Sequence, residues 1–192
     1  EVPTREAFLQ SRYIYAPLRV LDCDIPLTGA VAFILARDEL APDGPATPVY
    51  LHGFASRRQD FRAQSRHWGA TAAEVESWQI YEGFSVLMID AVERLGLCAP
   101  GEGTRYVAET TAARPGFIND FGGSLGEGRM HGMGHLLAAV QAVRRGAARA
   151  AADIGMWQLG ATALFGREPR RGPGPRPLSR REAAPRHLNA AA

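Results

Sequence analysis

The sequence predicts a layered α/β fold, in which helices cover the faces of a sheet. Short apolar runs rich in β-branched and aromatic residues, typical of buried strands, alternate with stretches whose apolar residues recur at helical spacing. The chain has 192 residues and a hydrophobic fraction of 46%, which is enough for one domain with its own core. We therefore expect one folded unit over residues 1–166.

The first part of the chain predicts a short helix and two strands. Thr4 can cap a helix within residues 4–12. A continuous apolar run at residues 30–36 predicts a strand buried on both faces. Turn-forming proline and glycine separate it from a strand at residues 49–55, and the polar stretch 60–76 is interpreted as helical.

The centre of the chain predicts a strand followed by an amphipathic helix. The strand covers residues 77–80, and the helix has apolar residues at helical spacing from Phe84 to Leu95. Gly96 ends this helix in a position where glycine is favoured. Residues 99–116 are interpreted as a loop around the sequence PGEG.

The last part of the body predicts a brief strand at GFIN, a glycine-rich loop, a helix and one or two strands. The loop FGGSLGEGRMHGMGH, residues 121–135, is too irregular for a strand and too rich in glycine to begin a stable helix. The helix carries Leu136 and Val143 on one face and ends at Gly146, and the final strand covers residues 161–165.

Composition excludes several classes of function. The tail, residues 167–192, is rich in arginine, proline and glycine, and we expect it to be disordered. Of the 22 basic residues, all arginine, seven lie in this tail, which leaves 15 against 18 acidic residues in a mildly acidic body. A nucleic-acid partner is therefore not expected. No apolar run is long enough to span a membrane, so we expect a cytoplasmic protein.

The two cysteines, Cys23 and Cys98, are far apart and lack the spacing of metal ligands. Neither lies beside a histidine or in a glycine-rich turn that would activate a nucleophile, so we interpret both as buried, reduced thiols. The chain begins at Glu1 rather than at methionine, and we interpret it as a fragment.

Two junctions between a strand and a helix carry residues suited to chemistry. Tyr81, followed by Glu82, can donate a hydrogen bond to an oxyanion or exchange a proton; the alternative is a half-buried packing residue with its hydroxyl in water. At the second junction, His131 can act as acid or base and Arg129 can hold a carboxylate or phosphate; the alternative is a surface histidine on a flexible loop. His131 and His135 have no third ligand near by, so no metal is expected.

Three motifs together resemble the C-terminal half of the thiolase superfamily: LDCDIPLTGAVAFILA, YEGFSVLMIDAVERLGLCAPGEG and FGGSLGEGRMHGMGHLLAAVQAVRRG. The chain is most similar to the lipid-transfer-protein branch, which includes sterol carrier protein x, and the resemblance covers residues 5–167. It implies a thiolase-like layered fold, of which this is the C-terminal half only, with a mixed sheet and helices on its faces. It also implies homodimers that act on acyl-CoA thioesters.

The departures from the family pattern point away from ordinary thiolysis. Tyr81 stands where the family motif has asparagine, and Glu82 matches the glutamate that follows it. Arg129 occupies the position of the usual catalytic histidine, with His131 two residues further on. The sequence has no cysteine after Cys98, so the second catalytic cysteine of condensing thiolases is missing. The pattern is similar to that of enzymes that cleave steroid side chains by retro-aldol chemistry on acyl-CoA.

The resemblance therefore predicts a thiolase-superfamily acyltransferase or carbon-carbon lyase of lipid or steroid side-chain metabolism, active together with an N-terminal half. Tyr81 and His131 are the predicted catalytic residues. Predicted substrate-binding residues are Glu82, Gly122, Gly123, Arg129, Gly132 and His135. We expect no cofactor other than coenzyme A as part of the substrate, and a possible partner with an OB fold and a zinc ribbon. The alternatives are a non-catalytic acyl-CoA or lipid-binding module and a truncated, inactive fragment.

Overall fold

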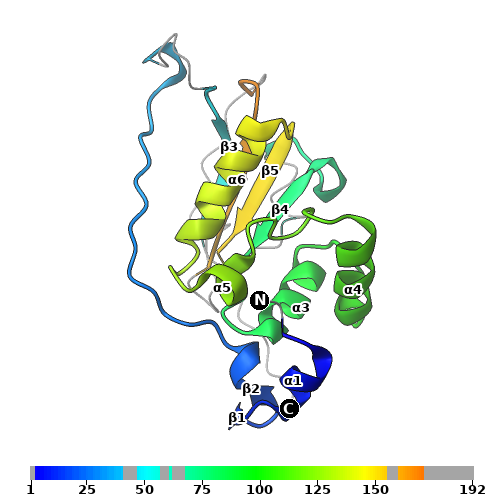
Figure 1. Ribbon diagram of the computed structural model, residues 1–192. Helices are drawn as coiled ribbons and strands as arrows, with labels where there is room; N and C mark the ends of the chain where they lie inside the picture. Colours follow the sequence, from blue (N-terminus) through cyan, green and yellow to red (C-terminus); the bar gives the residue numbers. More distant parts are fainter. Residues whose placement is uncertain (1–2, 41–46, 57–60, 62–67, 155–159, 171–192) are drawn as a thin grey trace, which may run out of the picture.

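The computed structural model covers all 192 residues and describes residues 3–40, 47–56, 61, 68–154 and 160–170. Its centre is a four-stranded mixed sheet with the order β3-β6-β5-β4 (Figure 1). The strands are β3 (Tyr50–Ser56), β4 (Ser77–Ile80), β5 (Arg149–Asp153) and β6 (Ala161–Gly166). β5 is parallel to β4, whereas β6 is antiparallel to β5 and β3. The α/β class and the strands predicted at 49–55, 77–80 and 161–165 are confirmed.

The two faces of the sheet carry separate apolar layers, because successive side chains of β5 point to opposite faces. Ala150 and Ala152 pack with Ala139 and Val143 of helix α6 (Met133–Arg145), the predicted helix that ends at Gly146. Ala151 belongs to a second cluster, which contains the fully buried ring of Trp78 together with apolar residues of helix α3 (Ser85–Arg94). The small alanine side chains allow α6 to lie close to the strands.

Helix α4 (Gly103–Ala113) occupies most of the segment 99–116, so the predicted loop there is wrong. Its amino end is fixed by α3, since the Gly103 backbone N–H donates a hydrogen bond of 2.9 Å to Glu93 Oε1. A Cβ atom at Gly103 would lie 2.7 Å from the carbonyl oxygen of Ile89. A tertiary contact that requires glycine therefore starts this helix, and the apolar periodicity of the segment does not reveal it.

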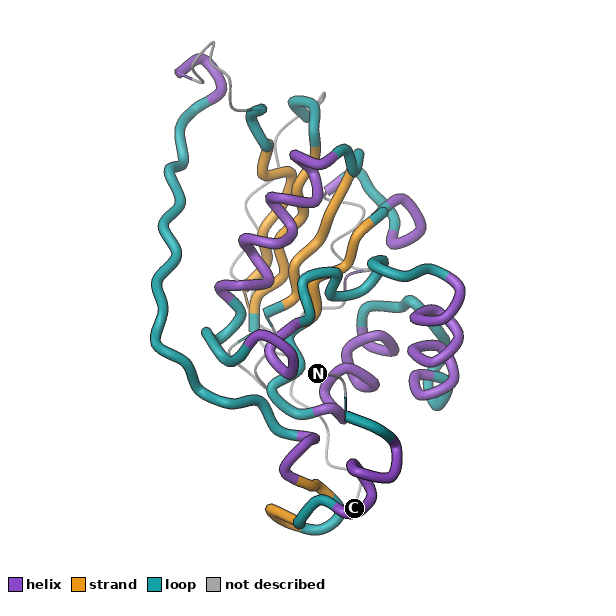
Figure 2. The backbone as a smooth tube through the Cα atoms, viewed as in Figure 1, coloured by secondary structure: helices purple, strands orange, loops and turns teal. Residues whose placement is uncertain are grey.

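The strand predicted at residues 30–36 is also wrong. The segment has no pairing partner among the described residues, and Ile34 and Leu35 are 99% and 76% exposed. Figure 2 shows it as part of a long loop that runs outside the sheet and the helices. The run has strand-like residues but no neighbouring backbone to pair with, and a strand is stable only when paired.

The remaining elements are short. Helix α1 (Arg5–Gln10) is capped by Thr4, as predicted, and precedes the small hairpin of β1 (Tyr13–Tyr15) and β2 (Leu18–Arg19). Three 3-10 turns follow: η1 (Val20–Asp22), η2 (Asp38–Leu40) and η3 (Ala72–Glu74). GFIN forms a single bridge, between Ile118 and Trp78, rather than a full strand.

The helix predicted over 60–76 is wrong over residues 69–76, which form a turn and the short 3-10 helix η3; of residues 60–68 only 61 and 68 are described. The tail beyond Arg170 lies outside the described residues. Within the described residues, none of the helices has the length and apolar character needed to cross a membrane.

Candidate active site

The two predicted junctions lie beside each other at one end of the sheet. Residues 81–83 lead from β4 to α3, and the glycine-rich loop contains the short helix α5 (Gly123–Glu127) and then leads into α6 (Figure 1). The predicted irregular loop thus contains one helical turn and a half. The first junction follows β4, and the second follows Ile118, which forms a parallel bridge to Trp78 of β4, so both leave the sheet in the direction in which β4 runs. Ligands of open α/β sheets bind at the carboxyl ends of the strands.

A third segment, residues 23–27, connects the two junctions. The Asp24 backbone N–H donates to the Gly83 carbonyl at 3.1 Å, and the Arg129 N–H donates to the Ile25 carbonyl at 2.8 Å. The first bond joins the segment to the β4–α3 junction, and the second joins it to the glycine-rich loop. The segment therefore delivers the Asp24 side chain between Tyr81 and Arg129.

Asp24, Tyr81 and Arg129 form a polar cluster. Asp24 Oδ2 lies 3.4 Å from the Tyr81 hydroxyl, which donates a long hydrogen bond to it. Asp24 Oδ1 lies 3.2 Å from Arg129 Nη1, and the Asp24 side chain is 1% exposed, against 31% for Arg129. Tyr81 is buried. The alternative in which its hydroxyl lies in water is therefore wrong, because the hydroxyl faces a buried carboxylate.

Burial changes the acidity of both partners. Burial, together with the negative charge of Asp24, raises the pKa of Tyr81 to about 12, although Arg129 opposes the increase. Burial also raises the pKa of Asp24, although Arg129 and the hydrogen bond from Tyr81 oppose the increase. Tyr81 consequently stays a neutral phenol at physiological pH and can act as a hydrogen-bond donor.

Glu82 and His135 form a second polar cluster, which contacts the first through the rings of His135 and Tyr81. Glu82 Oε2 lies 2.9 Å from His135 Nε2 and accepts a hydrogen bond of 2.8 Å from Asn119 Nδ2, while Oε1 accepts from the Leu125 N–H at 3.2 Å. His135 is 1% exposed, and its ring lies edge-on to that of Tyr81 with centroids 5.7 Å apart. These two predicted substrate-binding residues thus bind protein groups, and His135 packs against the ring of Tyr81.

His131 lies on the exposed side of the cluster. Its backbone has a φ of +50°, and its charge lowers the pKa of Asp24, which places its imidazole within electrostatic range of that carboxylate. His135 Nε2 is bound to the carboxylate of Glu82 and not to His131. Among the residues that the structure describes, no three His, Cys, Asp or Glu side chains are grouped to hold a metal ion.

The glycines of the loop are required by contacts within the protein. Gly122, Gly123 and Gly132 all have positive φ, of +101°, +66° and +85°. A Cβ atom at Gly123 would overlap the carboxylate of Glu82, and one at Gly132 would lie 2.5 Å from Ile154 Cγ2. Protein atoms thus occupy the space on those sides of Gly123 and Gly132. Whether their main-chain amides also approach a thioester stays a prediction.

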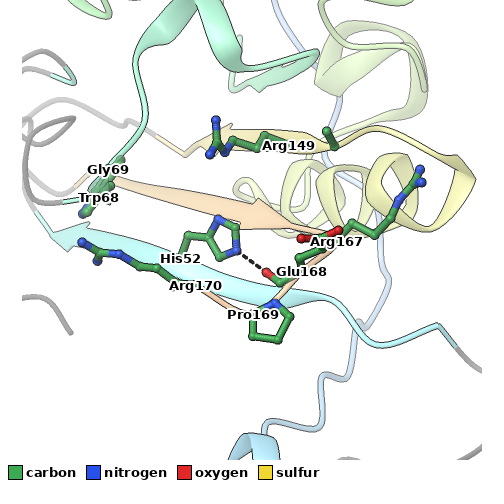
Figure 3. Close-up of a pocket in the computed structure, with 9 residues that line it drawn as sticks. His52, Trp68, Gly69, Arg149, Arg167, Glu168, Pro169 and Arg170 are labelled. Carbon is green, nitrogen blue, oxygen red and sulfur yellow. Dashed lines mark hydrogen bonds between the residues drawn. The ribbon is translucent and has the colours of Figure 1, made fainter. Parts of the chain in front are cut away.

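Among the described residues, one cavity lies beside the site and a larger one lies at the opposite end of the sheet. A cavity of about 190 Å³ borders the site and is lined by Leu27, Phe121, Met130 and His135, among others. The larger one, about 530 Å³, lies at the other end of the sheet around His52 and Arg149 (Figure 3). Figure 3 shows its arginine side chains pointing in different directions, and no predicted site residue lines it. Size alone therefore does not identify the candidate site.

Asp24 and Asn119 belong to the site, although neither is predicted from the sequence. Asp24 lies 57 residues before Tyr81, and only the tertiary fold brings the two side chains together. Asn119 has a φ of +49° and its side chain bonds both the backbone of Ile80 and Glu82. Asp24 does lie in the first of the three motifs that carried the family resemblance, which was the available signal.

Comparison with known proteins agrees with the resemblance. The chain is 29% identical to the steroid side-chain-cleaving aldolase of Thermomonospora curvata, over 73% of this chain and 42% of that protein. It is also 29% identical to the 17-hydroxy-3-oxo-4-pregnene-20-carboxyl-CoA lyase of Mycobacterium tuberculosis, over 73% of this chain and 43% of that protein. The chain therefore spans less than half the length of these curated relatives.

A solved structure and a family model support the same assignment. The structure named Ltp2-ChsH2(DUF35) aldolase is 22% identical and has a TM-score of 0.73, over 85% of this chain and 51% of that chain, so the thiolase-like fold is confirmed. The family model described as thiolase C-terminal domain-like matches residues 61–162, which is more than half of the chain. The chain therefore belongs to the thiolase C-terminal domain-like family.

Proposed function

We propose that this chain is the C-terminal half of a thiolase-superfamily enzyme that breaks a carbon-carbon bond in β-hydroxyacyl-CoA thioesters by a retro-aldol reaction. The observation that carries the proposal is the buried Tyr81 phenol, held by Asp24 beside Arg129. Relatives named as a steroid side-chain-cleaving aldolase and a CoA lyase support this class of reaction. By extension, we propose acyl-CoA esters of lipid or steroid side chains as substrates.

The reaction needs a group that takes the proton of the β-hydroxyl and groups that stabilise the thioester enolate. Tyr81 is suited to the reacting hydroxyl, since its phenol is fixed in direction by Asp24. His131 is suited to return a proton to the enolate carbon, because imidazole is the side chain that most often serves as a general acid or base. Arg129 supplies positive charge at the same place and is partly exposed. No cofactor is proposed beyond the coenzyme A of the substrate.

The described cysteines do not favour thiolysis within this half. Burial raises the pKa of Cys23, and neighbouring Asp22 and Asp24 raise it further. Burial likewise raises the pKa of Cys98. Thiols of this kind are poor nucleophiles at neutral pH, because the thiolate is the reactive form. Proton transfer by Tyr81 and His131 therefore fits the site better than covalent catalysis by these thiols.

The test uses the longest native polypeptide that contains these residues and follows β-hydroxyacyl-CoA by mass spectrometry. Retro-aldol cleavage gives a carbonyl compound and a shortened acyl-CoA in equal amounts. Tyr81→Phe should lower kcat/KM by about 100-fold or more, as expected on loss of an acid/base group or an oxyanion donor. Tyr15→Phe is the matched control, because Tyr15 is 81% exposed. Wild-type rates in Tyr81→Phe would show that the phenol has no part in the chemistry.

The second candidate is a non-catalytic module that binds acyl-CoA. It is favoured by the small cavity beside His135, whose lining includes the apolar side chains of Leu27, Phe121 and Met130. Isothermal titration with a non-hydrolysable acyl-CoA analogue separates the two candidates. Binding without turnover in the full native polypeptide would favour the module, and the absence of both would favour an inactive fragment.

Assembly and location are proposed on the family resemblance. We propose a homodimer, a cytoplasmic location and an acyl-CoA-binding partner with an OB fold and a zinc ribbon. The solved relative with the name Ltp2-ChsH2(DUF35) aldolase joins two components in that name, which supports a second component here. Exposed apolar side chains such as Ile14, Ile34 and Leu35 support burial in an interface. Light scattering of the native polypeptide, alone and with the partner, tests both forms of assembly.

A further inference from the structure

We infer that Asp24 is a positioning residue of this site, whose carboxylate receives, through the Tyr81 phenol, the proton that the substrate hydroxyl releases. The inference rests on the proposed function and adds the group that makes Tyr81 able to accept a proton. Asp24 belongs to a segment far from both predicted junctions in the sequence, and no role for it follows from either junction alone.

The geometry gives each carboxylate oxygen of Asp24 one partner. Arg129 Nη1 holds Oδ1 at 3.2 Å, which leaves Oδ2 directed at the Tyr81 hydroxyl, 3.4 Å away. The Asp24 backbone is itself anchored to the Gly83 carbonyl, two residues after Tyr81. Hydrogen bonds of catalytic groups are often long before substrate binds and shorten in the reacting complex. The arrangement thus fixes both the direction and the acceptor of the phenol proton.

The charges around Asp24 suit a proton acceptor. Arg129 and His131 lower its pKa and Glu82 raises it, while burial has the largest effect and raises it. A buried carboxylate with a raised pKa is a stronger base than an exposed one. Tyr81, with a pKa of about 12, is in its neutral form at physiological pH and cannot take a proton unless it gives up its own. The groups that face Asp24 are Arg129, His131, Tyr81, Glu82 and the thiol of Cys23.

The proposed step is balanced in protons and electrons. The β-hydroxyl proton moves to the Tyr81 oxygen while the Tyr81 proton moves to Asp24 Oδ2. The hydroxyl oxygen forms the carbonyl double bond, and the electron pair of the broken carbon-carbon bond moves to the α-carbon and the thioester oxygen as an enolate. His131, as imidazolium, protonates the α-carbon. Asp24 then loses its proton to solvent and His131 regains one, so that no net proton is consumed and no oxidant or reductant is needed.

The test replaces Asp24 by asparagine in the longest native polypeptide that contains the chain. Asp24→Asn keeps the shape and an acceptor oxygen but cannot take a proton, so kcat/KM should fall by about 100-fold with little change in KM. In the wild-type protein, kcat/KM should fall as the pH drops through the raised pKa of Asp24, and this acid limb should be absent from the residual activity of Asp24→Asn. Arg129→Gln should move the acid limb to higher pH, because Asp24 loses a neighbouring positive charge.

Asp22→Asn is the matched control for a purely structural effect. Asp22 is as buried as Asp24, and its carboxylate accepts hydrogen bonds from the Arg19 N–H at 2.8 Å and from the Ser85 hydroxyl at 2.5 Å. It does not contact Tyr81 or Arg129 in any recorded hydrogen bond or ion pair among the described residues. Asp22→Asn is expected to lower stability and to leave the acid limb in place.

A second measurement works without substrate. With tyrosine labelled at Cζ, carbon NMR reports the ionisation of each phenol. Tyr81 should remain a phenol over the range in which the exposed tyrosines titrate, and Asp24→Asn should move its titration toward theirs. Unchanged titration of Tyr81, or an acid limb retained in Asp24→Asn, would overturn the inference. A shifted titration in a protein that shows no turnover would instead place the failure in the proposed function.

Discussion

Gly123→Ala tests whether the cluster around Glu82 holds the site together. Gly123 begins α5 with a φ of +66°, a backbone conformation that favours glycine. An alanine Cβ there would overlap Glu82 Oε1 and lie 2.6 Å from Glu82 Cδ and 2.9 Å from Asn119 Nδ2. The Glu82 carboxylate would have to move away from the three groups that it binds, among them His135.

Two contributions set the size of the effect. The left-handed backbone costs alanine about 1–2 kcal/mol. Disrupting the buried contacts of a charged group costs about 3–5 kcal/mol, and Glu82 is only 4% exposed. The loss of unfolded-state entropy on Gly→Ala replacement offsets about 0.4–1 kcal/mol of this. We therefore expect the free energy of unfolding to fall by about 3–7 kcal/mol, a large fraction of the stability of a typical domain.

Gly126→Ala is the matched control, three residues further along the same helix. No atom lies within 4 Å of a Cβ placed at Gly126, so alanine fits there and should stabilise α5 by up to about 1 kcal/mol. Urea unfolding of the 192-residue chain, followed by near-ultraviolet circular dichroism, gives both free energies. Equal values for Gly123→Ala and Gly126→Ala would refute the reasoning, since they would show that the Glu82 cluster tolerates a side chain at position 123.

Two further predictions concern groups outside the cluster. The hydrogen bond from the Thr71 N–H, and to a smaller extent the hydrogen bond from Arg149, lower the pKa of Glu74 from 4.5 to about 2. The stabilisation that the Glu74 carboxylate contributes is therefore present above pH 4.5 and is lost as the pH falls toward 2. Glu74→Gln should therefore lower the free energy of unfolding by about 1 kcal/mol at pH 7 and by less at acidic pH. Urea unfolding at neutral and at acidic pH measures this, and an equal decrease at both would contradict the prediction. Burial raises the pKa values of Cys23 and Cys98. Both thiols should therefore react with iodoacetamide more slowly than free cysteine at pH 7.5, and faster once urea unfolds the protein. Rapid alkylation of the folded protein would contradict this prediction.

The buried strands of the sheet could be predicted because short runs rich in apolar, β-branched or aromatic residues are typical of buried strands. Residues 77–80 are all buried, and β6 is buried along most of its length. Residues 30–36 form a similar apolar run and are not a strand, because a strand needs a neighbouring strand to pair with and the run alone does not show whether one is present. Helix α4 shows the reverse case, where a contact between Gly103 and α3 starts a helix in a segment with weak periodicity.

The candidate site was predictable in part, for a related reason. Tyr81 and Arg129 follow elements that the sequence reveals, and both do reach one cluster. The orientation of Glu82 and His135 toward each other depends on the close approach of α5 at Gly123, which no local pattern encodes. Asp24 enters by a long-range connection, through backbone hydrogen bonds to both junctions.

The arrangement of the two clusters holds the phenol of Tyr81 in one direction. An isolated buried phenol with a pKa near 12 would be a hydrogen-bond donor and little else. The carboxylate of Asp24, which accepts a hydrogen bond from the phenol, can accept its proton. The guanidinium of Arg129 lowers the pKa of Asp24 and so opposes the effect of burial, which raises it. The Glu82–His135 pair then fills the space beneath the Tyr81 ring with satisfied polar groups, so the phenol cannot turn away from Asp24 without breaking ring contacts. The site therefore depends on long-range contacts as well as on particular residues of the loop, such as Gly123 and Arg129.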